Sequence, residues 1–373
     1  MQSGLMNTYE HPVSNRSWVA WALSALLFGA YVLLYFGPVP ALGLRFDLLQ
    51  RAAEALGAAL SLPAVLRSKW ILYGTVYTLA MIAGGAFFLR RHGNTPYQRL
   101  RTASVVGVQV VFAFLLPIVL QVFGHQEYYF TYFWPLKIEY FYPSVILAHP
   151  FLIVFWSFLG SLVAFPLLAY FLGKRFYCSW VCGCGGLANT FGEPFRHLSS
   201  KSTRAWSIEK VSIHGVLAAA VVTTAVVSLN WAVGKQHPAF AGFAFRVQEG
   251  YGFAIGAMFS GVLGVGLYPL MGTRVWCRFG CPMAALLGLA QKLGRFRIRV
   301  KKDMCIACGN CSTYCEMGID VRAYAMANQS FTRASCVGCG LCAHVCPRGV
   351  LRLENRPVRW QAGQPIRVDA VDL

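Results

Sequence analysis

Cysteines are the residues whose number and spacing point most directly to chemistry in this chain. Eight of the 13 lie in two runs of the form C-x2-C-x2-C-x3-C, one over residues 305–315 and the other over residues 336–346. Three cysteines in a tight loop can reach three corners of an iron–sulfur cubane, and 4Fe–4S sites use this spacing. The two runs therefore predict two 4Fe–4S clusters.

The fourth cysteine of each run lies too far along the chain to close its own cluster, and in two-cluster ferredoxins it binds the other cluster. The first cluster is thus assigned to Cys305, Cys308, Cys311 and Cys346, and the second to Cys336, Cys339, Cys342 and Cys315. Zinc ribbons do not use two four-cysteine runs of this form, and disulfides are disfavoured in the reducing cytoplasm. Glu316 follows Cys315 where a proline is usual, which alters the turn but removes no ligand.

A second group of cysteines follows two apolar segments. Its members are Cys178, Cys182, Cys184, Cys277 and Cys281. Its two C-x3-C motifs lie far apart in the sequence, but both come at the same end of their helices and can converge. Four soft ligands suffice for a third iron–sulfur cluster or a metal. A thiol pair for redox exchange and inert buried cysteines stay open as alternatives, and Cys184 is either a substitute ligand or a bystander.

The composition indicates a membrane protein. Of the 373 residues, 57% are hydrophobic and only 13% are charged, which excludes a soluble globule, a disordered tail protein and a polar nucleic-acid binder. Six segments without Asp, Glu, Lys or Arg are long enough to cross a bilayer. They are 17–36, 70–89, 102–124, 149–172, 211–232 and 251–271. The last carries small residues at 252, 256, 260 and 264, which favour close helix packing.

The basic residues predict the orientation. The N-terminal tail and the loops 90–101, 173–210 and 272–302 hold 19 basic and 3 acidic residues, whereas the alternate loops hold 7 and 5. Since basic loops stay in the cytoplasm, we expect a multi-pass protein of a bacterial inner membrane with both termini and the cluster domain on the cytoplasmic side. The net charge of +19 then marks topology and contact with membrane lipid, and no nucleic-acid partner is expected.

These features predict an α-helical polytopic membrane protein of about six transmembrane helices with a C-terminal α+β two-cluster bacterial-type ferredoxin domain. The expected parts are a cytoplasmic tail over 1–16, a membrane domain over 17–271 with an outer amphipathic segment near 44–60, a basic cytoplasmic linker over 272–302, the ferredoxin domain over 303–356 and a tail over 357–373. Apolar and basic residues alternate over 295–302, which predicts a strip against lipid headgroups or another subunit, or a solvated linker.

Nine aromatic residues crowd the outer loop between 128 and 142. An aromatic belt at the membrane interface is the commonest explanation for such a loop. A docking face for a partner subunit and one wall of a quinone pocket are the alternatives. Because the spans contain no acidic or basic side chain apart from histidines at their edges, the sequence does not predict an internal proton path.

Two membrane-edge C-x3-C motifs followed by a double-cluster domain resemble the membrane polyferredoxins of periplasmic nitrate and nitrous-oxide reductase systems. The group includes the iron–sulfur accessory protein of copper–haem oxidase assembly. The resemblance covers about residues 150–356 and rests on Trp276–Arg278 with Cys281-Pro282, on Cys305–Cys315 with Gly318–Val321, and on Cys336–Pro347. The first C-x3-C motif departs from the family, since Gly183 and Cys184 replace the usual proline.

The resemblance implies an electron-transfer subunit of the quinol dehydrogenase type. Such a protein relays electrons between the quinone pool and a partner redox subunit, or acts as a homo-oligomer, through two cytoplasmic 4Fe–4S clusters. A third iron–sulfur cluster or metal and a bound quinone are further expected cofactors. Two alternatives stay open: a maturation protein or metal reductase that assists another metalloenzyme, and a structural anchor whose clusters support folding.

Overall fold

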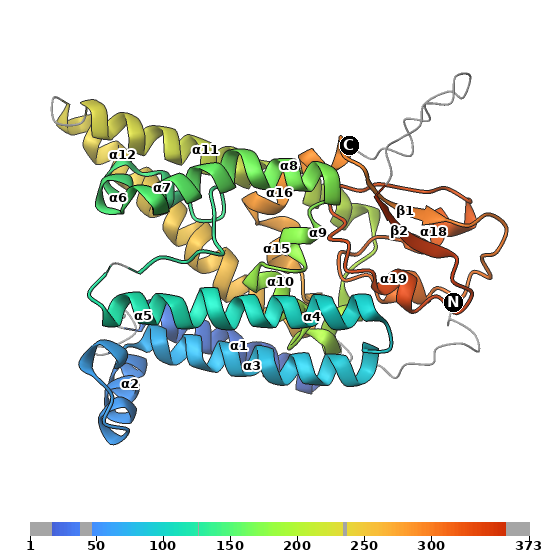
Figure 1. Cartoon of the computed structure of the whole chain (residues 1–373), viewed down its shortest axis with the longest axis horizontal. Coiled ribbons are helices and arrows are strands. Elements are labelled where there is room, and N and C mark those ends of the chain that lie inside the picture. Colours follow the sequence, from blue (N-terminus) through green and yellow to red (C-terminus); the bar gives the residue numbers. More distant parts are fainter. Residues whose placement is uncertain (1–16, 38–46, 126, 234–236, 356–373) are drawn as a thin grey trace.

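The computed structural model describes residues 17–37, 47–125, 127–233 and 237–355. Long helices run side by side, and a small module of two strands and short helices caps one end of them (Figure 1). The predicted tails over 1–16 and 357–373 lie outside the described residues.

The helices that precede the module follow the chain in order. They are α1 (Trp18–Phe36), α2 (Leu48–Ala59), α3 (Lys69–His92), α4 (Pro96–Val108), α5 (Leu116–Val122), α6 (Pro143–Ala148), α7 (Phe151–Phe158), α8 (Phe165–Leu172), α9 (Arg175–Cys178), α10 (Gly183–Asn189), α11 (Thr203–Val233), α12 (Pro238–Tyr251), α13 (Gly264–Gly266), α14 (Tyr268–Met271), α15 (Val275–Phe279) and α16 (Pro282–Lys292). Three π-helical stretches, Gln109–Leu115, Leu159–Ala164 and Gly252–Leu263, join α4 to α5, α7 to α8 and α12 to α13. Short 3-10 turns cover Ala64–Leu66, Ile138–Phe141 and Glu193–Leu198.

The module contains two strands and three short helices. They are β1 (Phe296–Val300), α17 (Asn310–Thr313), α18 (Val321–Met326), α19 (Leu341–His344) and β2 (Leu351–Asn355). Capping residues set several helix starts in the chain: the Ser17 side chain accepts a hydrogen bond from Ala20 N at α1, and Asp320 accepts one from Ala323 N at α18.

Five helical segments are long and apolar enough to cross a membrane. They are Trp18–Phe36, Lys69–His92, Pro96–Val122, Phe151–Leu172 and Thr203–Val233. These segments coincide with the first five predicted spans. The outer amphipathic segment predicted near 44–60 forms α2, although its first residues, up to 46, lie outside the described residues.

The sixth predicted span, over 251–271, is helical but interrupted. Its π-helical stretch Gly252–Leu263 leads into α13, and Pro269 and Gly272 then confine the segment to the short helix α14. Upstream the helix continues as α12, which carries Arg246 and Glu249. The segment is therefore not among the five long apolar helices.

The structure differs from the predicted linker over 272–302, because these residues form regular elements. Helices α15 and α16 follow the interrupted span, and β1 pairs antiparallel with β2 from Phe296↔Asn355 to Val300↔Leu351. The alternation of apolar and basic residues is the two-residue period of this strand, whose residues Phe296, Ile298 and Val300 are buried. The module therefore begins at β1, earlier than the boundary predicted at 303.

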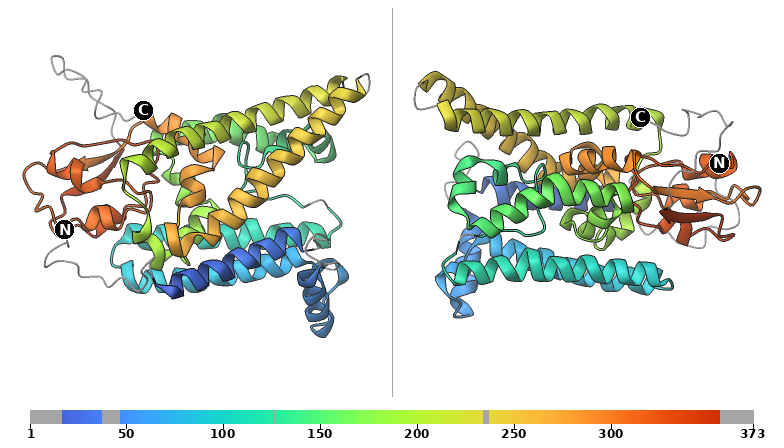
Figure 2. Two further views of the ribbon diagram at one scale, coloured as in Figure 1. Left: turned by 180° about the vertical axis from the view of Figure 1, so that it is seen from behind. Right: turned by 45° about the horizontal axis from the view of Figure 1, so that its top comes forward.

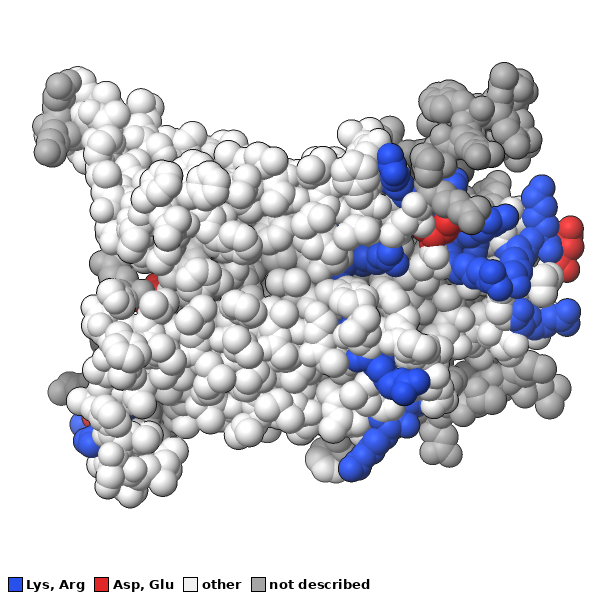
Figure 3. Space-filling view, viewed as in Figure 1, with Lys and Arg blue, Asp and Glu red and all other residues white. Residues whose placement is uncertain are grey.

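The two ends of the molecule differ in charge. The module stays at one end in every view, while α2 and the junction between α11 and α12 lie at the other (Figures 1 and 2). Lys and Arg side chains gather at the module end, and the surface over the helices is nearly free of charge (Figure 3). The charges are thus sorted between the ends as the loop counts predict, and we call the second end the far end.

A buried ionic network joins the helices to the module, and Glu316 is at its centre. The Glu316 carboxylate lies 2.9 Å from Arg196 Nη1 and 2.9 Å from Arg274 Nη2. Arg196 Nε also lies 2.7 Å from Glu193, which in turn lies 2.8 Å from His92 Nε2. Each of these side chains is at most 1% exposed. Burial would raise the pKa of Glu316, but the charges of Arg196 and Arg274 outweigh it and hold the pKa at about 2.

We expect Glu316→Gln to destabilise the protein strongly, because it leaves two buried guanidinium groups with too little negative charge. Breaking such a buried pair lowers the free energy of unfolding by about 3–5 kcal/mol. Glu354→Gln is the matched control, since Glu354 also contacts two arginines, Arg297 and Arg299, but at a partly exposed site where the loss is about 0–1 kcal/mol. Thermal unfolding in detergent followed by size-exclusion chromatography compares the two, and equal shifts would contradict the role of Glu316.

Candidate iron–sulfur site

The cysteines of the module line two separate small cavities. One cavity is lined by Cys305, Cys308, Cys311 and Cys346. The other is lined by Cys315, Cys336, Cys339 and Cys342. Each cavity thus takes three cysteines from one run and the fourth from the other run.

The loops around these cavities suit a cubane better than a single ion. Gly309 and Gly340 have φ values of 87° and 74°, a left-handed conformation that lets each loop turn tightly after a cysteine. Ala307 N donates to Cys305 Sγ over 3.5 Å, and such N–H groups help to set the potential of a cluster. Among the described residues, no three His, Cys, Asp or Glu side chains converge as ligands of one ion would. A cluster that lies between its ligands needs this wider spacing.

Four consecutive carbonyl groups of the loop 336–339 accept hydrogen bonds from the helical part of the chain. The bonds are Gln291 Nε2 to Cys336 O (2.9 Å), Ser179 Oγ to Val337 O (2.7 Å), Tyr97 OH to Gly338 O (2.7 Å) and Gln98 Nε2 to Cys339 O (3.1 Å). The donors come from three separate places, which are the start of α4, the residue after α9, and α16, so the loop is held from several sides. The second cavity therefore faces the membrane helices, and Ser179 connects it to the neighbouring Cys178.

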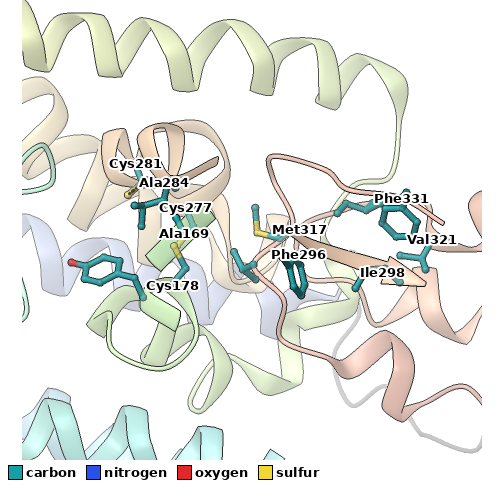
Figure 4. Close-up of a cluster of buried hydrophobic side chains, with 14 of the residues drawn as sticks. Ala169, Cys178, Cys277, Cys281, Ala284, Phe296, Ile298, Met317, Val321 and Phe331 are labelled. Carbon is teal, nitrogen blue, oxygen red and sulfur yellow. Dashed lines mark hydrogen bonds between the residues drawn. The ribbon is translucent and has the colours of Figure 1, made fainter. Parts of the chain in front are cut away.

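Four of the five cysteines outside the module meet in the buried core between the helices and the module. Cys178, Cys182, Cys277 and Cys281 are each 5–7% exposed. Figure 4 shows three of them close together, with Met317 and Phe296 of the module beside them. Burial raises the pKa of Cys178, Cys277 and Cys281, whereas a hydrogen bond from Cys184 lowers that of Cys182. Thiols this deeply buried are out of reach of another protein's disulfide, so the geometry does not favour a thiol-exchange pair.

Two buried cations lie beside this cysteine group. Arg274 Nη1 is 3.6 Å from Cys277 Sγ and 3.4 Å from the carbonyl oxygen of Cys178. Lys174 is fully buried, its ammonium has no hydrogen-bond partner among the described residues, and its charge acts on both Cys178 and Cys336. A buried ammonium group is costly unless negative charge lies nearby. The site is therefore built for an anionic group.

The two C-x3-C motifs belong to an internal repeat. The sequences GKRFYCSWVC at 173–182 and GTRVWCRFGC at 272–281 share the glycine, an arginine, an aromatic residue and both cysteines. Gly173 and Gly272 both have positive φ, and each follows a helix that contains a π-helical stretch. The motifs therefore converge as two copies of one unit. At Gly183, where the first copy lacks the proline, a Cβ would lie 2.6 Å from both Gln109 Oε1 and the Tyr77 hydroxyl.

A large cavity of about 870 Å³ extends from this cysteine group to the far end of the molecule. Cys184, Cys277 and Trp276 line it at one end, and the exposed acids Glu127, Glu139 and Glu249 line it at the other. Its volume is typical of a small-molecule site. Its walls are rich in tyrosine, and the tyrosines are Tyr31, Tyr35, Tyr73, Tyr77, Tyr129, Tyr132, Tyr142, Tyr251 and Tyr268.

Two sequence-based interpretations change once this cavity is known. The small residues at 252, 256, 260 and 264 line the cavity, and a Cβ at Gly252 or Gly256 would meet nothing within 4 Å, so the packing interpretation of this stripe is wrong at those two glycines. The aromatic outer loop does not simply form a belt at the interface either. Tyr129, Tyr132 and Tyr142 line the cavity, because the loop folds inward.

Comparison with known proteins agrees with this geometry. A family model described as a 4Fe-4S dicluster domain matches residues 298–353, and a model described as a 4Fe-4S binding domain matches twice, over 148–202 and 252–301. "Putative electron transport protein YccM" of Escherichia coli (strain K12) is 26% identical over 165 residues, which are 43% of this chain and 46% of that protein. "Methylamine utilization ferredoxin-type protein MauN" of Paracoccus denitrificans (strain Pd 1222) is 28% identical over 187 residues, 45% of this chain and 61% of that protein.

These matches support a polyferredoxin-like family. They confirm the resemblance that the cysteine motifs indicate, and the matched models are those of 4Fe-4S cluster domains. The chain spans about half to three fifths of the curated relatives that it matches. No solved structure matches it.

Sequence reasoning about this polyferredoxin missed the buried cations and the hydrogen-bond donors around the cysteines. Lys174 and Arg274 were counted only as part of the basic loops that set the orientation. The repeat could have drawn attention to Arg274, since an arginine, Arg175 or Arg274, lies three residues before each C-x3-C motif. Lys174 aligns with Thr273 and has no such signal. The donors Ser179, Gln98 and Gln291 have no such signal, because they come from elements far apart in the sequence.

The polyferredoxin module offers a direct test of how the two runs share ligands. We expect Cys315→Ser to remove the same low-temperature EPR signal of the reduced protein as Cys336→Ser, because both residues line one cavity. Cys346→Ser and Cys305→Ser, each as a single variant, should both remove the other EPR signal. If Cys315→Ser instead matched Cys305→Ser, the fourth cysteine of each run would bind its own cluster and the crossed assignment would be wrong.

Proposed function

We propose that this protein oxidises a membrane quinol and passes the electrons through its iron–sulfur centres to a partner redox protein on the module side. One observation carries the proposal: the large cavity among the apolar helices is lined at its inner end by Cys277 and Cys184. A lipid-soluble donor in that cavity would lie directly against the cysteine group. Iron–sulfur centres, when bound, accept and donate single electrons, which suits a two-electron donor oxidised in two steps.

The chemistry of the cavity wall supports a quinol as the ligand. Aromatic rings offer stacking surfaces for a quinone ring, and tyrosine hydroxyls can donate or accept hydrogen bonds to its two oxygens. Glycines at 252 and 256 leave the wall open where the ring would enter. The helices around the cavity are apolar on their outer surface, so a ligand dissolved in the lipid can reach them.

Two buried cations support a third centre at Cys178, Cys182, Cys277 and Cys281. The charge of Lys174 acts on Cys178, and Arg274 Nη1 lies 3.6 Å from Cys277 Sγ. Arg274 is paired with Glu316, but the Lys174 ammonium has no hydrogen-bond partner among the described residues. An iron–sulfur cluster with thiolate ligands carries negative charge and would offset it. Cys184 lines the cavity instead, and we assign it no ligand role.

The arrangement also suggests the order of the centres. Electrons from the membrane-edge cysteines would reach the cavity of Cys336 first, because Ser179 bonds its loop directly. The cavity of Cys305 is farther out, and the neighbouring Ile306 is 44% exposed. A partner redox subunit would exchange electrons there. We further propose that the interrupted helix over 251–271 is a sixth crossing and that the basic module end is cytoplasmic, in a bacterial inner membrane.

Filling the cavity tests the donor site. We expect Gly256→Leu to reduce the rate of cluster reduction by a short-chain ubiquinol at least tenfold, because the new side chain occupies open space in the cavity. Reduction by dithionite, followed by the loss of visible absorbance, should stay unchanged. Gly215→Leu is the matched control, since Gly215 also lies in a helix with no atom within 4 Å but does not line the cavity. Equal quinol rates in the two variants would refute the site, and no quinol reduction of the wild type would refute the function.

Counting iron tests the third centre. We expect about 12 iron atoms per chain in the wild type and about 8 in the double variant Cys277→Ser/Cys281→Ser, with both module EPR signals retained. Cys184→Ser should keep about 12, since this residue is assigned no ligand role. A wild-type value of about 8 iron atoms would leave the membrane-edge cysteines without a cluster.

A further inference from the structure

We propose that the protein separates charge: protons from the quinol leave toward the far end of the molecule, while its electrons leave toward the module. This inference rests on the proposed function, because it concerns the same cavity and the same donor. It depends on which end of the cavity is closed, which end is open, and what lies between them.

The inner end of the cavity is closed and carries no acidic or basic side chain. The lining residues there, Leu187, Tyr268, Trp276 and Cys277, are each 3–7% exposed. On the module side of Cys277, Arg274 lies 3.6 Å from Cys277 Sγ and pairs with the buried Glu316. A proton released in the cavity therefore has no wet route toward the module within the described part of the chain.

The far end of the cavity is open and acidic. Glu127, Glu139 and Glu249 line it and are exposed, and the Glu139 side chain is 59% exposed beside Lys137. Carboxylates at the mouth can accept protons from the cavity and release them to water.

Hydroxyl groups line the space between the two ends. The hydroxyls of Tyr31 and Tyr73 are 3.0 Å apart, and the Tyr77 hydroxyl is buried without a partner among the described residues. A hydroxyl both donates and accepts, so a row of them can pass a proton without becoming charged. Polar cavities of this size also hold water, which completes such a row. A proton route therefore exists although the spans contain no acid or base.

The reaction balances in these terms. Oxidation of the quinol to the quinone breaks two O–H bonds and releases two protons and two electrons. The electrons pass one at a time to the iron–sulfur centres held by the cysteines on the module side, and the two protons pass along the hydroxyl-lined cavity to the far end. Each turnover thus moves two negative charges and two positive charges toward opposite ends of the molecule.

Proteoliposomes with the module facing outward test the inference. The orientation is established by protease cleavage of the module, and the lumen contains the pH dye pyranine. Decylubiquinol is the donor, and ferricyanide outside the vesicles is an acceptor that takes electrons but no protons. Vesicles without protein correct for direct reaction between the two. We expect the lumen to gain about one proton per ferricyanide reduced, and an uncoupler to abolish this acidification.

The possible results separate this inference from the proposed function. Ferricyanide reduction with protons appearing only outside would overturn the charge separation and leave quinol oxidation intact. No quinol-dependent ferricyanide reduction, under conditions where dithionite reduces the clusters, would overturn the proposed function itself.

Two carboxylates at the mouth test the route. We expect Glu139→Gln/Glu249→Gln to slow luminal acidification several-fold. Glu54→Gln is the matched control, because Glu54 is an exposed acid of α2 that does not line the cavity. Unchanged acidification in the double variant would overturn the route through the far end.

Discussion

The contact of Glu316 with Arg196 and Arg274 is the interaction on which the rest of the structure depends. It fixes the module on the helices between the two groups of cysteines. Glu316 directly follows Cys315, and Arg274 lies beside Cys277, so one buried carboxylate connects a cysteine loop of the module to a cysteine motif of the membrane edge. A buried ion pair of this kind is weak evidence for stability as such, but it specifies one arrangement, because either charge alone would be costly. The residue that departs from the usual proline is thus the residue that determines the docking.

Four hydrogen bonds to the carbonyl groups of the loop 336–339 position this loop more precisely than the ion pairs do. Charges act over several ångströms and tolerate small shifts, whereas the bonds to the loop 336–339 are 2.7–3.1 Å long and directional. Rates of electron transfer depend steeply on distance, so a chain of centres needs its members held rigidly. The loop near the helices is held in this way, whereas the outer loop carries the exposed Ile306.

The sequence predicted what depends on local spacing. Five apolar helices, the cysteine runs and their sorting to one end follow from residue types and periods, and so does the family. What could not be predicted depends on contacts between distant segments. The alternation over 295–302 fits a strand as well as a lipid-facing strip, and only its pairing with β2 decides between them. Glycines at four-residue spacing favour helix packing in general, yet here they leave space for a cavity. The sequence also predicts which four cysteines share a site, because in a double motif the fourth cysteine of each run binds the cluster of the other run. The two cavities contain these same two sets of cysteines.

The repeat explains why one fold can hold both a redox site and a cavity. Each copy ends an apolar helix with a glycine of positive φ, places its first cysteine in a short helix, and places its second at the N-cap of the helix that follows. Two copies facing each other place four cysteines in one core, and the π-helical stretch of the second copy lines the cavity beside it. The copies differ where the cavity requires it: Gly183 replaces a proline because Gln109 and Tyr77 fill the position that a side chain would take.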